Sequence, residues 1–255
     1  MNNWYDDYDY AKYWNTREYE HRSEALALTS FLAKIPHIKT IADIGGGYGR
    51  LFPYYSTRAK TIQLLEPSKK LLKEARQKLL PPKKTKLNFI FTDIKHSHKK
   101  LKNIKVDMII MIRVAHHLDD IEEAISIISK ILPSKGHLIM EFANKMHGKA
   151  IFQNLIKGNL TFPLDIFPSD ISPKNPLNKG IPFKNYHPEL IIEVLERYGL
   201  KVIEKRSVSN IRLPLLKKIF PINWLLLVES LMQKPLAKYY FGPSIFILAQ
   251  KQGSN

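Results

Sequence analysis

Cysteine is absent from this 255-residue chain. Its absence excludes disulfides, thiolate metal sites and a cysteine nucleophile, and it excludes a disulfide-stapled secreted scaffold. The chain also lacks an uninterrupted apolar run near the roughly 18 residues of a membrane-spanning helix, since charges and prolines break its most apolar late stretch, residues 211–232. The N-terminus is acidic and aromatic, without a basic segment followed by an apolar one, so we expect no secretory signal and a cytoplasmic protein.

Acidic residues are few. The chain has 23 Asp and Glu and 40 Lys and Arg, which gives a net charge of +17. Residues 69–105 carry 13 basic and 2 acidic side chains and residues 201–255 carry 9 and 2, whereas residues 1–24 carry 3 and 6. A positive field attracts phosphates, nucleic acid or anionic lipid. Arginine, which sequence-specific readers of nucleic acid favour, is scarce. We therefore prefer a solvated lysine-rich surface and keep nucleic-acid binding as an alternative.

Short apolar runs alternate with helical patterns from about residue 40 onward. Seven strands are predicted, at residues 40–44, 61–65, 87–91, 106–112, 137–142, 201–207 and 244–250. Residues 68–80 have a helical apolar stripe with Ser68 as N-cap, and Asp119 or Asp120 begins a helix that reaches Leu132. This alternation is typical of an α/β fold with a parallel sheet and helices on both faces.

Two segments interrupt the alternation. Residues 144–188 are rich in Asn, Pro, Gly and Lys and have no sustained period, and a segment of that length is usually functional or mobile. A helix at residues 187–198, with Pro188 in its first turn, restores the order. About 35 residues between the last two strands look helical, amphipathic and basic.

The most informative segment is IADIGGGYGR, residues 41–50. Glycines at the end of a strand allow positive φ and close approach of a ligand, and the helix start that follows offers unpaired N–H groups. The dinucleotide pattern G-x-G-x-x-G fails here, because its glycines would fall at Arg50 or at Tyr48. What stands is D-x-G-x-G-x-G, formed by Asp43, Gly45, Gly47 and Gly49. The acid before the first glycine would repel a pyrophosphate and attract an ammonium group.

With this motif the chain resembles the class I S-adenosylmethionine-dependent methyltransferases, in particular the methyltransferase type 11 group. In that family the glycine loop, here with Gly46 and Tyr48 between the other glycines, holds the methionine part of the cofactor. The acid corresponding to Asp43 lies near the cofactor ammonium. The resemblance covers residues 10–142 well and 187–207 moderately. It implies a seven-stranded, mostly parallel, doubly wound Rossmann-like sheet with insertions after strand 5 and between strands 6 and 7.

Three further family features lie at the ends of the next predicted strands. Open parallel sheets bind their ligands at the carboxyl ends of the strands. Glu66, followed by Pro67, corresponds to the acid that accepts from both ribose hydroxyls. Asp93 and Ile94 correspond to neighbours of the adenine amino group and ring, and Arg113 ends the fourth strand. The resemblance thus implies S-adenosylmethionine bound by Arg17, Asp43, Gly45, Gly46, Gly47, Tyr48, Gly49, Glu66, Pro67, Asp93, Ile94 and Arg113.

Arg17 lies in a segment that resembles the N-terminal cap of some family members. There it would meet the carboxylate of the methionine part. Alternatively, Arg17 pairs with Glu20 or Glu24 on its own helix, and the nearby aromatic side chains only pack.

Histidines provide the other candidate chemistry. His116 or His117 could act as a general base, since an unperturbed histidine titrates near neutrality, or the pair could pack and cap a helix. His96 and His98 suggest a metal site, but the flanking lysines repel cations. We interpret them as part of a solvated loop, and no metal is implied.

The resemblance implies methyl transfer from a sulfonium to a nucleophile. The apolar and aromatic insertions favour a small-molecule or lipid-like acceptor; RNA or ribosomal modification and a non-catalytic S-adenosylmethionine-binding module are the alternatives. Residues 211–232 could contact an anionic membrane surface, or pack on the sheet or in a dimer, and the oligomeric state stays open. The expected divisions are an N-terminal helical cap (1–35), a cofactor-binding core (36–143), a substrate or lid insertion (144–188), and a C-terminal part (189–255) with a helical insertion at about 210–243.

Overall fold

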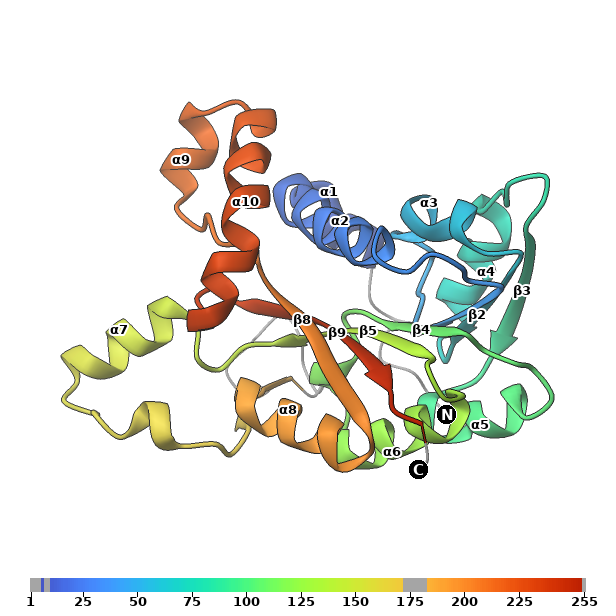
Figure 1. The fold of residues 1–255 in the computed structure, drawn as a ribbon. Helices are drawn as coiled ribbons and strands as arrows, with labels where there is room; N and C mark the ends of the chain where they lie inside the picture. Colours follow the sequence, from blue (N-terminus) through green and yellow to red (C-terminus); the bar gives the residue numbers. More distant parts are fainter. Residues whose placement is uncertain (1–5, 7–9, 172–182, 254–255) are drawn as a thin grey trace.

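The computed structural model describes residue 6 and residues 10–171 and 183–253. Its centre is a seven-stranded sheet in the order β3-β2-β1-β4-β5-β9-β8 (Figure 1). The strands are β1 (Thr40–Ile44), β2 (Thr61–Glu66), β3 (Lys86–Phe91), β4 (Met108–Met111), β5 (His137–Ala143), β8 (Leu200–Val208) and β9 (Ser244–Lys251). Only β9 runs antiparallel to its neighbours within this sheet. The predicted seven-stranded, mostly parallel sheet is confirmed.

Helices cover both faces of the sheet (Figure 1). One layer holds α2 (Glu18–Leu32), α3 (Phe52–Tyr55) and α4 (Lys69–Lys78), and the other holds α5 (Ile94–Leu101), α6 (Ile121–Ile131) and α8 (Pro188–Arg197). In β1, Ile41 packs into the first layer, whereas Ala42 and Ile44 pack into the second. The central strands β4 and β5 are buried on both faces and are apolar almost throughout, whereas the edge strand β8 is partly exposed and polar.

The predicted helix starts have their expected caps. Ser68 Oγ accepts the N–H of Leu71, 3.1 Å away, at the start of α4. Of the two candidates at the later helix, Asp120 is the cap of α6, and its carboxylate accepts two backbone N–H groups. Pro188 is the first residue of α8. These local signals are confirmed because each depends only on residues adjacent in sequence.

Two parts of the chain differ from the sequence prediction. The irregular insertion contains α7 (Gly148–Ile156) and a small sheet of β6 (Ser169–Asp170) and β7 (Lys184–Asn185), while its residues 172–182 lie outside the described ones. No residue of α7 is buried, and its apolar residues Ile151, Phe152, Leu155 and Ile156 form a single short helical stripe that the sequence prediction did not use. The predicted loop around His96 and His98 is wrong, because these residues lie in α5.

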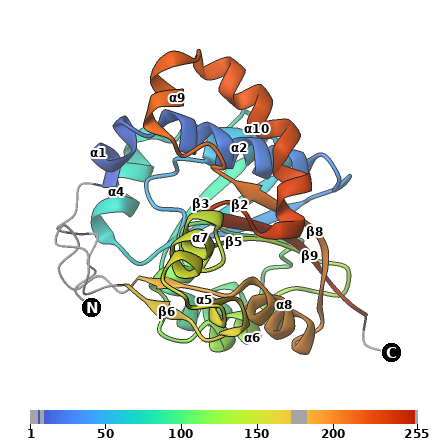
Figure 2. The same cartoon turned by 90° about the vertical axis from the view of Figure 1, so that its left-hand side faces the viewer.

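The remaining helices lie at the two ends of the chain. The helix α1 (Tyr10–Asn15) precedes α2, and α9 (Pro214–Ile219) and α10 (Ile222–Leu236) lie between β8 and β9. In the described part of the chain, four 3-10 helices connect elements, at Ser56–Arg58, Ala115–His117, Phe162–Leu164 and Ala237–Tyr239. The helices α7, α9 and α10 project on the same side of the molecule (Figure 1; Figure 2). Within the described residues, no helix is both long and apolar enough to cross a membrane.

Candidate cofactor and acceptor site

The glycine loop turns back over the end of β1. Gly45 has φ +71°, and a Cβ on it would come within 2.3 Å of Val114 Cγ2. A Cβ on Gly46 would come within 2.8 Å of Asp43 Oδ2. The N–H groups of Gly45 and Gly46 both donate to the Leu65 carbonyl, at 2.8 and 3.2 Å. Only glycine fits this turn, because neither the conformation nor the space admits a side chain.

Glu66 connects the glycine loop to the start of α4. Its side chain is buried at the end of β2, where Oε2 accepts the N–H of Gly47 and Oε1 accepts the N–H of Ser68, each at 2.8 Å. Burial raises the pKa of Glu66 to about 7, although both N–H groups favour the charged form. Each carboxylate oxygen retains a lone pair, so Glu66 can accept from two neighbouring hydroxyls. Pro67 is the residue between Glu66 and Ser68.

Asp43 lies beneath the glycine loop, 6% exposed. The hydroxyl of Tyr55, from α3, donates to its Oδ2. Burial raises the pKa of Asp43 to about 6, while this hydrogen bond and the charge of Arg50 oppose the shift. The structure therefore holds a carboxyl group that can become an anion when a cation approaches it.

Asp93 and Ile94 follow β3, next to the end of β2. Asp93 is the N-cap of α5: its Oδ1 accepts the N–H of His96 at 2.9 Å and lies 2.7 Å from His96 Nδ1. Ile94 is buried against the second helical layer. Neither residue lines the cavities described below.

A narrow cavity of about 30 Å3 lies beside the glycine loop. Of the predicted residues, it is lined by Asp43, Gly45, Gly46, Gly47, Tyr48 and Arg113. Tyr10, from α1, lies over the loop, with its ring centroid 6.0 Å from that of Tyr48. The sequence analysis missed Tyr10, whose contact depends on a helix packing back across the sheet edge.

Arg113 stands at the end of β4 in a conformation that is sparsely populated for a side-chain-bearing residue, with φ +64°. Its backbone N–H donates to Glu141 Oε2 at 2.8 Å, and its guanidinium lies 3.9 Å from Oε1. Glu141 is fully buried in β5, which raises its pKa, and it also accepts from the Ser244 hydroxyl. Strain of this kind costs on the order of 1–3 kcal/mol and concentrates at functional sites. Glu141 was missed, although a lone acid in an apolar strand was a visible signal.

A second cavity, of about 280 Å3, adjoins the first across Arg113, which lines both. Its wall comes from α1 and α2, the end of β5, the insertion that follows it, and the ends of β8 and β9. Its charged and aromatic lining consists of Tyr13, Trp14, Arg17, Glu20, Glu24, Arg113, His147, Phe183 and Arg212.

The two carboxylates of this cavity are already paired with other cations. Glu24 pairs with Arg50, and Glu20 pairs with Lys217. The alternative that Arg17 pairs with either of them is therefore wrong. The Arg17 guanidinium instead lies over the ring of Tyr13, 4.2 Å from its centroid.

Arg17, Arg212 and His147 can each donate hydrogen bonds to a molecule in this cavity. In the described part of the chain, neither Arg17 nor Arg212 has a carboxylate within ion-pair distance. His147 Nδ1 accepts the N–H of Ala150, and burial and the charge of Arg212 lower the pKa of His147 to about 4. This histidine is thus neutral at pH 7 with its proton on Nε2. No sequence signal could have indicated that Arg212 and His147 converge.

The histidine pair after β4 lies behind the second cavity. His116 is 2% exposed, its ring centroid is 4.0 Å from that of His117 and 4.5 Å from that of Phe183, and burial holds its pKa well below the usual range. Neither histidine lines either cavity. No cluster of three or more metal-ligating side chains occurs among the described residues.

Comparison with known proteins agrees with this architecture. Residues 42–140 match the family model described as "Methyltransferase domain". None of the curated proteins matches the sequence significantly.

Solved structures share the fold at low identity. A methyltransferase from Thermotoga maritima, described as a possible histamine N-methyltransferase, is 16% identical with a TM-score of 0.62, and the match covers 99% of this chain and 100% of that one. A protein from Listeria monocytogenes, described as an S-adenosylmethionine-dependent methyltransferase, is 15% identical over 91% of this chain and 99% of that one, with a TM-score of 0.60.

A third structure was determined with S-adenosylhomocysteine bound. The magnesium protoporphyrin IX methyltransferase from Synechocystis is 17% identical over 91% of this chain and 84% of that one, with a TM-score of 0.56. The matched residues 42–140 contain Asp43, the glycine loop and Glu66. Residues 42–140 therefore form a methyltransferase domain, within a chain that has the fold of S-adenosylmethionine-dependent methyltransferases.

Proposed function

We propose that this methyltransferase acts on a small acceptor that carries an anionic group and binds in the cavity of about 280 Å3. The observation that carries the proposal is the set of donors there, Arg17, Arg212 and His147, beside carboxylates that already have partners. The family resemblance places Arg17 at the carboxylate of the cofactor, but Arg17 lines this second cavity and not the one beside the glycine loop, so we assign it to the acceptor instead. Guanidinium groups bind carboxylates and phosphates in a planar, two-pronged geometry. The cavity volume is near the lower end of ligand sites, which favours a small acceptor.

The residues beside the first cavity fit S-adenosylmethionine. Asp43 would hold its ammonium, the glycine loop with Tyr48 would enclose its methionine part, and Glu66 followed by Pro67 would accept from the ribose hydroxyls. Asp93 and Ile94, at the neighbouring strand end, are proposed neighbours of the adenine. When bound, the cofactor would supply the methyl group of its sulfonium. The rest of the cofactor would be released as a neutral thioether, so the leaving group would need little acid catalysis.

The chain's own task is to align the acceptor and exclude water. Tyr13, Trp14 and Phe183 give the second cavity aromatic walls, and Arg113 lies where the two cavities meet. Glu20 and Glu24 are held in ion pairs, and the pKa of His147 is about 4. Since none of these is a strong base at pH 7, we propose that the acceptor atom ionises by itself and releases its proton to solvent.

The most basic segment does not support an RNA acceptor at this cavity. Residues 69–105 form α4, β3 and α5, at the opposite edge of the sheet from α7, α9 and α10 (Figure 1). The cavity instead lies where the insertions that contain α7, α9 and α10 begin, since His147 precedes α7 and Arg212 precedes α9.

A labelled-methyl screen tests the proposal. The purified chain is incubated with methyl-labelled S-adenosylmethionine and with acidic, neutral and basic small-molecule extracts, lipids and RNA. We expect the label in an acidic small-molecule product, and its yield should fall in Arg212→Gln. A label that appears only in RNA, or only in neutral or basic products, would contradict the anionic acceptor.

A further inference from the structure

The helices between β8 and β9 carry an unusual exposed face. We call residues 213–239 the α9–α10 arm. In α10, Leu225, Leu226, Glu229 and Gln233 are buried, on the side that packs against α2 and β8. The other side exposes one stripe at helical spacing, formed by Trp224, Leu227, Leu231, Lys234 and Lys238.

Large apolar side chains dominate this exposed face. Leu215 and Ile219 of α9 are more than half exposed, and Phe220 stacks on Trp224 with ring centroids 4.5 Å apart. Leu227 and Leu231 are 58% and 68% exposed. Single exposed apolar residues are common, but a contiguous patch of this kind usually marks a site of interaction.

The exposed charged groups of the α9–α10 arm are all positive. Its one carboxylate, Glu229, is fully buried and accepts from the Tyr19 hydroxyl and the N–H of Ser209. Lys218, Lys234 and Lys238 are exposed. The arm therefore presents apolar side chains and ammonium groups, with no carboxylate among them.

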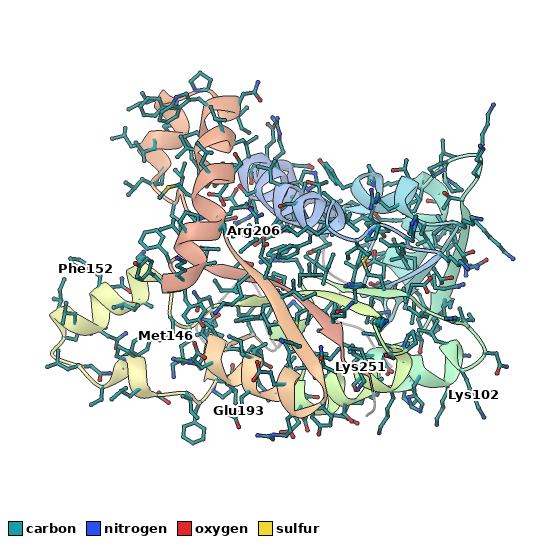
Figure 3. The ribbon with its side chains drawn as sticks, viewed as in Figure 1. Lys102, Met146, Phe152, Glu193, Arg206 and Lys251 are labelled. Atoms are coloured by element: carbon teal, nitrogen blue, oxygen red, sulfur yellow. The ribbon has the colours of Figure 1, made fainter. Side chains whose placement is uncertain are left out.

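A second apolar segment projects on the same side of the molecule. We call residues 148–168 the α7 arm, which includes Phe152 (Figure 2; Figure 3). The exposed apolar residues of this arm are Phe152, Leu155, Ile156, Leu160, Leu164, Ile166 and Phe167. Its one carboxylate, Asp165, is paired with Lys145. Both arms thus combine exposed apolar surface with little free negative charge.

We propose that the α9–α10 arm and the α7 arm together form a docking surface for an anionic lipid bilayer. Apolar and aromatic side chains enter the headgroup region while lysines pair with lipid phosphates, as in interfacial amphipathic helices. A second copy of this chain fits less well, because it would bring two lysine-bearing faces together without carboxylates between them. His147 and Arg212 lie at the bases of the two arms, so docking places the acceptor cavity next to the bilayer.

Vesicle sedimentation with the full chain tests the apolar part of this surface. We expect binding to phosphatidylcholine vesicles that contain about 30 mol% phosphatidylglycerol and much weaker binding to phosphatidylcholine alone. Leu227→Asp/Leu231→Asp should reduce the partition coefficient about tenfold or more. The matched control is Leu80→Asp/Ile203→Asp, which changes two exposed residues outside both arms. Unchanged thermal unfolding verifies that each variant is folded.

A second pair of variants separates local from general electrostatics. Lys218→Gln/Lys234→Gln/Lys238→Gln and Lys99→Gln/Lys100→Gln/Lys102→Gln remove the same charge, but the second set lies in and just after α5, with Lys102 far from both arms (Figure 3). Only the first set should weaken binding, by about tenfold or more. Vesicles should also shift tryptophan emission to shorter wavelength, and Trp224→Phe should remove most of that shift.

Three outcomes would overturn the docking surface. These are no binding to anionic vesicles, equal weakening by both lysine sets, or a dimer in solution that Leu227→Asp/Leu231→Asp dissociates. None of them bears on cofactor binding or on the identity of the acceptor, which are measured without vesicles.

Discussion

The two cavities that meet at Arg113 are built in opposite ways. Beside the first, Asp43 and Glu66 are buried, and their oxygens accept from groups close in sequence or on adjacent strands. Beside the second, Arg17 and Arg212 have no ion-pair partner among the described residues, and the carboxylates are neutralised by distant segments, as Glu20 is by Lys217. The first cavity is thus specified by local motifs of the common fold, and the second by contacts between the cap and the insertions.

The largest expected effect is on the carboxylates of the first cavity. Glu66→Ala removes an acceptor for two hydroxyls, and Asp43→Ala removes the partner of an ammonium. Glu66→Ala should weaken S-adenosylmethionine binding about a hundredfold or more and Asp43→Ala about tenfold or more, since hydrogen bonds to charged groups contribute about 1.5–3 kcal/mol each. Calorimetry on the folded variants measures this, with the exposed Glu193→Ala as control. Unchanged affinity in Glu66→Ala would remove the assigned role.

The same carboxylates predict a pH dependence of cofactor affinity. The pKa of Glu66 is about 7 and that of Asp43 is about 6 in the ligand-free chain. Only the deprotonated forms serve the cofactor, so affinity should be full above pH 7 and fall as the pH drops through 7 and then 6. We expect a loss of about a thousandfold between pH 8 and pH 5, about a hundredfold from Glu66 and about tenfold from Asp43. A flat profile in calorimetry would contradict it.

Two glycines with similar φ compare the glycine loop with the insertion that contains α7. Gly45 has φ +71° and Gly158 has φ +74°, but a Cβ meets Val114 at Gly45 and has nothing within 4 Å at Gly158. Gly158→Ala should cost about 1–2 kcal/mol of unfolding free energy from the left-handed conformation alone. Gly45→Ala adds an overlap of about 1–3 kcal/mol. Equal destabilisation in urea unfolding would show that the loop relaxes away from Val114.

The smallest expected effect concerns the acceptor. Arg17→Gln and Arg212→Gln should each raise the KM for the acceptor about tenfold, the order of one charged hydrogen bond, and leave the cofactor Kd unchanged. Arg197→Gln, on the surface of α8, is the matched control. A fall in kcat with an unchanged KM would instead place these arginines in alignment rather than recognition.

The sequence predicted those elements whose signal lies in residues adjacent to one another in the chain. The central strands β1, β4 and β5 followed from buried apolar runs, and Ser68 and Asp120 marked helix starts through their own side chains. The helix α7 was missed although Ile151, Phe152, Leu155 and Ile156 have helical spacing, because the Asn, Pro, Gly and Lys that surround this one short period made the whole insertion look irregular. Arg212 and His147 were missed for another reason: they are 65 positions apart, and only the paths of two insertions bring them to one cavity.

One short helix, α1, lines both cavities. Within six residues, α1 places Tyr10 over the glycine loop and lines the neighbouring cavity with Tyr13 and Trp14. If α1 moves so that the methyl donor can enter or leave, it also removes Tyr13 and Trp14 from the wall of the proposed acceptor cavity. We expect ordered binding, with the methyl donor before the acceptor and the demethylated donor released last. The rate at which α1, a helix of six residues, moves away from the site then sets an upper limit on turnover.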